Sequence, residues 1–136
     1  MTAQTDLPLV ILPERLAVCR LTADAALPDW ASPGDLLALV RTAEELSIVC
    51  TERYVPPEVR AERGWRVIQV QGPLEFSMVG VLASIAVPLA RVGISIFVLS
   101  TFDTDYILVK EDALDRAVGA LTQAGFLVMN YVRLSA

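Results

Sequence analysis

The chain has 136 residues, of which 54% are hydrophobic and 20% charged, and its net charge is −5. This length suits one ordinary domain, or two very small ones that share a core, and it excludes a large multi-domain enzyme. The eleven basic residues form no run, so the sequence offers no positive surface for a phosphate backbone, and no nucleic-acid partner is expected.

The longest apolar stretch, residues 78–89, is interrupted by Ser84 and Pro88. It is shorter than the roughly 20 residues that cross a bilayer, so no membrane partner is expected. The first residues lack the basic and apolar segments of a signal peptide, which favours a cytoplasmic protein. In that reducing compartment Cys19 and Cys50, both inside apolar strand-like runs, are predicted to be buried free thiols.

The composition argues against catalysis. The chain contains no histidine, which removes the most common general acid–base group and both serine–histidine and cysteine–histidine nucleophile schemes. No glycine-rich loop of the kind that cradles phosphates occurs either. We therefore predict no catalytic residue, no cofactor and no metal site, and we do not expect an enzyme.

The chain begins with a predicted β-hairpin. Residues 9–12 and 16–21 are short apolar runs, and Pro13 with two charged residues separates them.

Two further strands are predicted at residues 36–41 and 47–51. Between them, Thr42 and Glu45 have the spacing of a capping box, which indicates one helical turn. Residues 54–64 are rich in proline and charge and form the candidate boundary between the two halves of the chain.

From Trp65 onwards the pattern becomes regular and predicts alternating strands and helices. The predicted order is strand, helix, strand, strand, helix, strand, which is typical of an α+β fold with a ferredoxin-like βαββαβ unit. The expected elements are a strand at 65–70, a helix within 78–93, strands at 94–100 and 105–110, a helix from Glu111 to Gly125, and a strand at 126–134.

The first of these helices has an apolar stripe at three- and four-residue spacing. The stripe predicts burial of one face against the sheet. Its members are Val79, Leu82, Ile85, Leu89 and Val92, and Gly93 is expected to end the helix.

Four segments carry a resemblance to a known family: residues 72–76, the helix that contains Gly80 and Leu82, residues 94–97, and residues 100–109. They are similar to an ACT domain, and in particular to small bacterial proteins built from two ACT-like units, which are related to the ACT repeats of animal cytosolic arginine sensors. Residues 41–50 resemble the first unit of that group. The resemblance implies a smaller, degenerate ACT-like unit at residues 1–62 and an ACT domain at residues 63–136.

The resemblance also implies a function. ACT domains commonly hold an amino acid between two units, through the loop after the first strand, the start of the first helix, and the second strand of the adjoining unit. Free N–H groups at a helix N-terminus favour the α-carboxylate, and a nearby carboxylate accepts the α-ammonium. We therefore expect an amino-acid-binding regulatory or sensor module that forms a homo-oligomer, most simply a dimer, and acts on a regulated enzyme partner.

Carried over residue by residue, this site falls in two segments, and each has an alternative interpretation. The loop is equally consistent with a tight turn, in which Gly72 and Pro73 shape the backbone. Glu75 is also consistent with an acidic residue in the first turn that stabilises the helix. The expected ligand-binding residues are Gly72, Pro73, Leu74, Glu75, Phe76, Ser77 and Met78 in the loop, and Ser95, Ile96, Ser100, Thr101, Asp103 and Asp105 in the second segment.

Asp103 and Asp105 are two residues apart, so on a strand they share one face and form an acidic pocket for a cationic ligand. The alternative is that Asp103 caps the turn while Asp105 is solvated. Ser95 and Ser100 either donate hydrogen bonds to a ligand or satisfy backbone groups at the edge of the sheet.

Two other functions stay open at this point. The chain is also consistent with a ligand-free structural or protein-interaction subunit that dimerises through its sheets. A small enzyme that uses Asp103, Asp105 or Glu75 is the remaining alternative.

Overall fold

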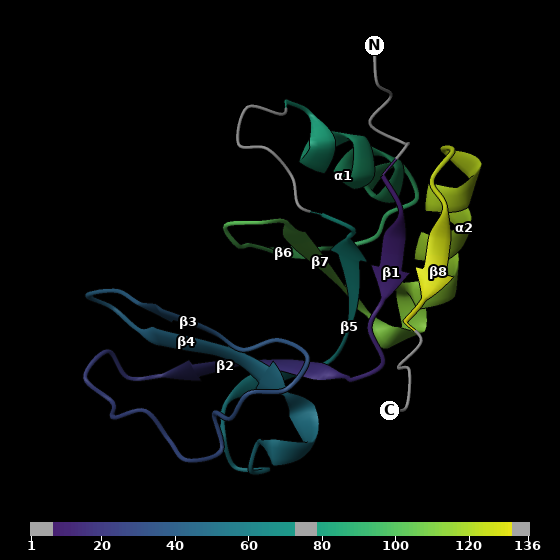
Figure 1. The fold of residues 1–136 in the computed structure, drawn as a ribbon. Coiled ribbons are helices and arrows are strands. Elements are labelled where there is room, and N and C mark those ends of the chain that lie inside the picture. The colour runs from purple at the N-terminus through teal and green to yellow at the C-terminus, as the bar shows by residue number, and fades with distance from the viewer. Residues whose placement is uncertain (1–6, 73–78, 132–136) are drawn as a thin grey trace, which may run out of the picture. The chain divides into compact units, whose positions relative to one another are not determined.

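The computed structural model describes residues 7–72 and 79–131, and the chain divides into two compact units (Figure 1). The larger unit comprises Met1–Pro13 and Arg66–Ala136, and the smaller unit comprises Glu14–Trp65. The predicted division after residue 62 differs from this arrangement, because the first residues of the chain belong to the larger unit.

The smaller unit is an antiparallel sheet. Its strands are β2 (Leu16–Leu21), β3 (Ala38–Arg41), β4 (Leu46–Thr51) and the first half of β5 (Ala61–Val70), in the order β3-β4-β2-β5. The 3-10 helix η2 (Glu52–Tyr54) follows β4. Apolar side chains on one face form its core, among them Ala17, Cys19, Ile48 and Cys50, against which Trp30 packs.

The segment between β3 and β4 is a tight hairpin turn, not the predicted helical turn. The Thr42 hydroxyl accepts hydrogen bonds from the N–H groups of Glu44 and Glu45, both at 3.1 Å, and the Thr42 N–H donates to the Glu45 carbonyl. The threonine therefore caps backbone groups as its spacing suggested. It does so in a hairpin because β3 and β4 pair directly, with Arg41 opposite Leu46.

β5 contains an irregularity at Gly64, which has a φ of 79°. The register of β2 against β5 shifts between Leu16 and Val18, so one extra residue is accommodated there. Glycine tolerates this left-handed conformation without a side-chain clash. Residues 61–64, predicted as part of a boundary, are consequently strand.

The larger unit has the strand order β6-β7-β5-β1-β8. Its strands besides the second half of β5 are β1 (Leu9–Ile11), β6 (Phe97–Ser100), β7 (Asp105–Lys110) and β8 (Val128–Asn130). Its helices are α1 (Val81–Arg91), the 3-10 helix η3 (Glu111–Ala113) and α2 (Leu114–Gln123). From β5 to β8 the elements follow the predicted βαββαβ order, which confirms the α+β, ferredoxin-like class.

β1 does not form the predicted hairpin with β2. It runs antiparallel to β5, with Leu9 opposite Val70, and parallel to β8, with Leu9 opposite Val128. Both of its edges are therefore occupied within the larger unit. The strand lies between the first and last strands of the βαββαβ unit.

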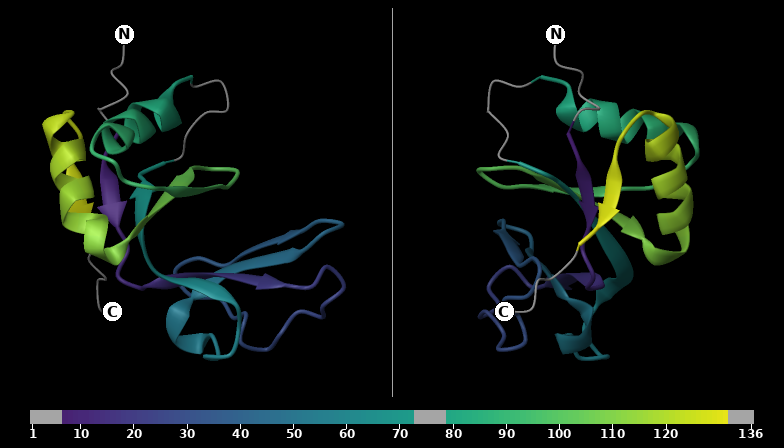
Figure 2. Two further views of the ribbon diagram at one scale, coloured as in Figure 1. Left: turned by 180° about the vertical axis from the view of Figure 1, so that it is seen from behind. Right: turned by 45° about the vertical axis from the view of Figure 1, so that its right-hand side comes forward.

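Both helices cover one face of this sheet (Figure 2) and close a single core with it. The predicted stripe of α1 is partly wrong. Ile85 and Leu89 are fully buried, but Val79 is 83% exposed. The helix begins only at Val81, after Gly80 with a φ of 83°, so the buried face runs through Val81, Ile85 and Leu89.

Candidate functional site

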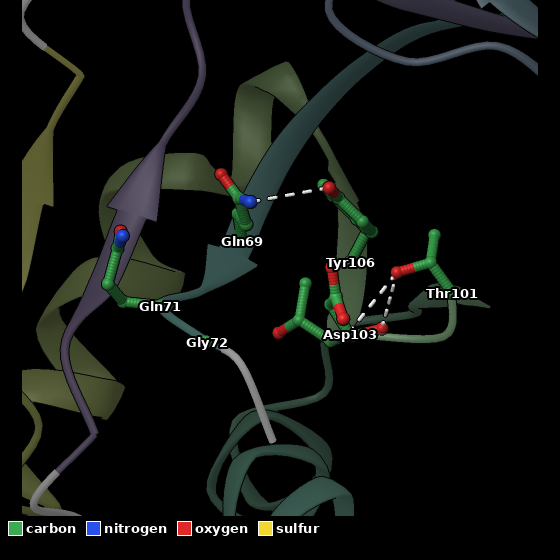
Figure 3. A pocket seen from close by; sticks show the side chains of 7 residues that line it. Gln69, Gln71, Gly72, Thr101, Asp103 and Tyr106 are labelled. Atoms are coloured by element: carbon green, nitrogen blue, oxygen red, sulfur yellow. Dashed lines mark hydrogen bonds between the residues drawn. The ribbon is translucent and has the colours of Figure 1, made fainter. Parts of the chain in front are cut away.

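A pocket of about 330 Å³ opens in the larger unit, where β5 ends beside the turn between β6 and β7 (Figure 3). Polar residues dominate its lining. They are Gln69, Gln71, Gly72, Thr101, Asp103, Thr104 and Tyr106.

The alternation of β5 places two of these side chains. Ile68 and Val70 point into the core beneath the helices, so Gln69 and Gln71 lie on the opposite face of the sheet. The Gln69 amide nitrogen lies 3.3 Å from the Tyr106 hydroxyl, to which it donates a hydrogen bond, and Figure 3 shows the two side chains directed towards each other. The pocket therefore opens on the face of this sheet that carries no helix.

The β6–β7 turn supplies the other wall, and several hydrogen bonds hold it in place. The Thr101 N–H donates to the Thr104 carbonyl at 2.8 Å, and the Thr104 N–H donates to the Thr101 hydroxyl at 3.2 Å. The Thr104 side chain is buried, and its hydroxyl donates to the Val70 carbonyl at 2.6 Å. This last bond connects the turn to the end of β5, so it joins the two walls of the pocket.

The lining defines what the pocket can hold. Its donors and acceptors are amide and hydroxyl groups, and the exposed Asp103 is the one charged side chain among the residues that line it. Such a lining suits a small ligand rich in hydrogen-bonding groups, and an ammonium or guanidinium group is the natural partner for the carboxylate.

Three of the predicted ligand-binding residues line this pocket: Gly72, Thr101 and Asp103. Residues Pro73 to Met78 lie outside the described residues. Ser95 is exposed in the connection before β6, while Ile96 packs against the core beneath the helices. Neither of these two lines the pocket.

Asp103 lines the pocket, whereas Asp105 is not among its lining residues. Asp105 is the first residue of β7, and its carboxylate accepts a hydrogen bond from the Ser100 hydroxyl at 2.6 Å. Asp103 lies in the turn, where the Thr101 side chain does the capping. The turn interrupts the strand alternation on which the prediction relied. Among the described residues, no group of three or more histidine, cysteine or acidic side chains is placed to hold a metal ion.

Sequence reasoning missed Gln69, Gln71, Thr104 and Tyr106. The alternation of polar and apolar residues along β5 was a usable signal for the two glutamines. Thr104 and Tyr106 gave no such signal, because their importance depends on contacts with residues more than thirty positions earlier.

A second hollow, of about 170 Å³, lies in the smaller unit and is lined by Arg15, Thr51, Glu52 and Arg53. Both arginines already face carboxylates: Arg15 lies 3.6 Å from Glu52, and Arg53 lies 2.5 Å from Glu14. These carboxylates balance the positive charges of the two arginines. We therefore regard the hollow as part of the structure of this unit and not as a ligand-binding site.

Glu14 stabilises this part of the smaller unit. Burial raises the pKa of its carboxyl, but hydrogen bonds from the Asp35 N–H, Arg53 and Thr51 together lower that pKa below its ordinary value. The carboxylate form is thus favoured. Its two oxygens connect the loop at Asp35 with the end of β4.

Cys19 and Cys50 are buried free thiols, as predicted. Cys19 lies opposite Ile48 and Cys50 opposite Ala17, so the two cysteines are diagonal neighbours on β2 and β4. The hydrogen bond with Cys19 raises the pKa of the Cys50 thiol, and burial raises it further. Diagonal positions in an antiparallel pair are about 7–8 Å apart, which is wider than the usual spacing for a disulfide.

The part of the chain that the structure describes contains no helix long and apolar enough to span a membrane.

Comparison with known proteins gives two family matches. A family model described as "ACT domain" matches residues 60–123, and a second, described as an N-terminal domain, matches residues 14–58. A crystal structure of a protein from Agrobacterium tumefaciens is 37% identical, with 96% of this chain and 97% of that chain covered and a TM-score of 0.87.

Two further relatives match more distantly or over a shorter stretch. The human "cytosolic arginine sensor for mTORC1 subunit 1" is 41% identical over 58 residues, which are 42% of this chain and 18% of that protein. The chain thus spans less than a fifth of the length of this relative. The regulatory subunit of aspartate kinase from Thermus flavus is 12% identical, with 86% of this chain and 96% of that chain covered and a TM-score of 0.59, and shows a shared fold alone.

Proposed function

The chain belongs to the ACT-domain family, and we propose that it is a regulatory module that binds a free amino acid in the larger unit. The observation that carries the proposal is the polar pocket between the end of β5 and the β6–β7 turn. A cytosolic sensor of arginine is among the proteins similar to this chain, which supports the same class of ligand.

The pocket chemistry suggests how the ligand binds. Asp103 accepts an ammonium or guanidinium group of the amino acid, and Tyr106 and Gln69 supply neutral hydrogen bonds. The carboxylate of the ligand is assigned to the N–H groups of the predicted loop, residues 72–78, as the family resemblance implies. Ser95, Ile96, Ser100 and Asp105 remain predictions for an adjoining copy.

Binding is proposed to act through assembly. A ligand held where two ACT-like units meet changes how tightly those units associate, and a regulated enzyme responds to that change. We propose further that the chain is cytoplasmic, that it has no catalytic activity of its own, and that the smaller unit is a degenerate ACT-like unit.

A ligand-free interaction module is the second candidate. The observation in its favour is the exposed apolar surface of α1, where Leu82 and Val87 are 37% and 45% exposed although the helix also has a buried apolar face. A helix that is apolar on both faces is typical of one covered by another protein surface.

Calorimetric titration with each of the twenty standard amino acids separates the two candidates. We expect one or a few to bind, and Asp103→Asn to weaken that binding by about 10- to 100-fold, because a charge-assisted hydrogen bond contributes about 1.5–3 kcal/mol. Tyr106→Phe is expected to weaken it less, because it removes one neutral hydrogen bond.

Asp24→Asn provides the matched control, since Asp24 is exposed in the smaller unit and the charge change is the same. Absence of binding by all twenty amino acids up to millimolar concentration would overturn the proposal. If an amino acid binds Asp103→Asn as tightly as the unaltered chain, the binding site is not this pocket.

A further inference from the structure

The strand β8 leaves one edge of the larger unit's sheet open. It pairs with β1 alone among the strands that the structure describes. The Leu9 N–H donates to the Leu127 carbonyl at 2.8 Å, and the Tyr131 N–H donates to the Ile11 carbonyl at 2.9 Å. In a parallel ladder the backbone groups of alternate residues face the neighbouring strand, so those of Val128 and Asn130 point outward.

The side chains along this edge form an exposed apolar row. Val128 packs against the core beneath the helices, so its neighbours Leu127, Met129 and Tyr131 lie on the opposite face. They are 60%, 40% and 46% exposed. No charged residue occurs between Phe126 and Tyr131, although lysine or proline commonly protects such edges against pairing.

We propose that β8 pairs with β8 of a second copy of this chain, antiparallel and about a twofold axis at Met129. This register satisfies every outward backbone group of the strand. Val128 of each copy faces Asn130 of the other as a hydrogen-bonded pair, which gives four hydrogen bonds, while Met129 faces its own symmetry mate as a non-hydrogen-bonded pair.

The same register also matches the side chains. Leu127 of one copy lies opposite Tyr131 of the other, so the two apolar rows combine into one continuous strip across the axis. The strand itself is neutral in a chain of net charge −5, so this edge brings two copies together without placing carboxylates opposite each other. A second copy of this chain fits these requirements, because the edge is complementary to itself.

The proposed contact buries a small area, so the affinity of the dimer is expected to be low. One strand and three side chains per copy bury less than the roughly 800 Å² per partner of a standard stable interface. A weak dimer is therefore expected, one that forms as the protein concentration rises and that a ligand or a regulated partner can shift. The inference concerns assembly and does not depend on the identity of the amino acid.

Disulfide trapping tests the register. In Met129→Cys the two introduced thiols face each other in a non-hydrogen-bonded pair, whose Cα atoms are about 4.5 Å apart, and mild oxidation is expected to give a covalent dimer. In Leu127→Cys the two introduced thiols are separated by four residues along the joined strands, so little dimer is expected. The unaltered chain serves as the blank, because Cys19 and Cys50 are buried. Equal trapping in both variants, or none in Met129→Cys, would overturn the register.

Sedimentation velocity over a range of concentrations tests the interface without cross-linking. Met129→Glu places two carboxylates opposite each other and is expected to weaken self-association by more than about tenfold. Val87→Glu makes the same change at a similarly exposed site on α1 and is expected to leave self-association unchanged. Loss of the dimer in Val87→Glu but not in Met129→Glu would assign the interface to α1. A chain that stays monomeric at all concentrations would refute the proposed pairing of β8. If Met129→Glu fails to fold, the trapping experiment decides.

Discussion

At Gly34 the smaller unit leaves no space for a side chain. A Cβ added there would lie 2.9 Å from Glu14 Oε1 and closer still to Thr51 Oγ1. Thr51 is buried, and its hydroxyl donates to Glu14, which in turn accepts the Asp35 N–H at 2.8 Å. Glycine at this position therefore allows the loop to approach the end of β4.

We predict that Gly34→Ala lowers the free energy of unfolding by about 1–3 kcal/mol, since the added methyl group must displace Thr51 and Glu14. Urea denaturation measures this loss. Gly119→Ala is the control: Gly119 lies in α2 with nothing within 4 Å of an added Cβ, and the change should stabilise the helix by about 0.5–1 kcal/mol. An unaffected Gly34→Ala would show that the loop moves freely away from β4.

Among the elements, the β6–β7 turn depends on one buried side chain. The Thr104 hydroxyl bonds to the Val70 carbonyl, so the turn that carries Thr101 and Asp103 is attached to the end of β5. The pocket therefore owes its geometry to a contact between two elements.

Thr104→Val keeps the shape of the side chain and removes this donor. We expect a loss of about 1–3 kcal/mol in the free energy of unfolding, because the Val70 carbonyl loses its partner in a buried setting. Thermal and urea denaturation check it, with Thr122→Val as the control at an exposed position on α2. Amide hydrogen exchange should also quicken at residues 101–104, and unchanged exchange there would contradict the role given to this bond.

Across the whole molecule, the placement of β1 connects distant parts of the chain. Leu9 is fully buried in the core of the larger unit, between β5 and β8. Without β1, both β8 and the second half of β5 lose the strand with which they form hydrogen bonds along that edge.

Leu9→Ala is expected to destabilise the chain by about 2–5 kcal/mol, as core truncations of this kind do. Hydrogen exchange gives the more specific result: protection should fall first at β8 and at residues 68–70 of β5. Leu27→Ala, at a residue that is 52% exposed, should leave that protection intact. A selective loss of protection in β2 instead would support the hairpin that the sequence predicted.

The helix α1 shows how a small local feature limits prediction. The spacing of apolar residues identified the helix and its end at Gly93, whose φ is 75°. The predicted stripe included the buried Ile85 and Leu89, but it also included Val79, which precedes the left-handed Gly80, and it omitted the buried Val81. A periodic pattern allows several faces when nearly all positions are apolar, and only packing selects one.

Part of the candidate site could also be predicted from the sequence. Gly72, Thr101 and Asp103 came from family likeness and line the pocket, while Gln69 and Tyr106 were missed. Asp105 accepts a hydrogen bond from Ser100 and is not among the residues that line the pocket. These side chains meet because β5 and β7 are neighbours, and no local pattern specifies which polar residues face each other across two strands.

The sequence by itself determined the α+β class, the element order from β5 to β8 and the limits of β2 and β7, because each depends on periodicity and turn residues within a short window. The tertiary structure alone decided that β1 lies between β5 and β8, and where the polar pocket forms. A short apolar strand satisfies its backbone equally well beside any strand with a free edge, so its partner is chosen by the core that forms around it.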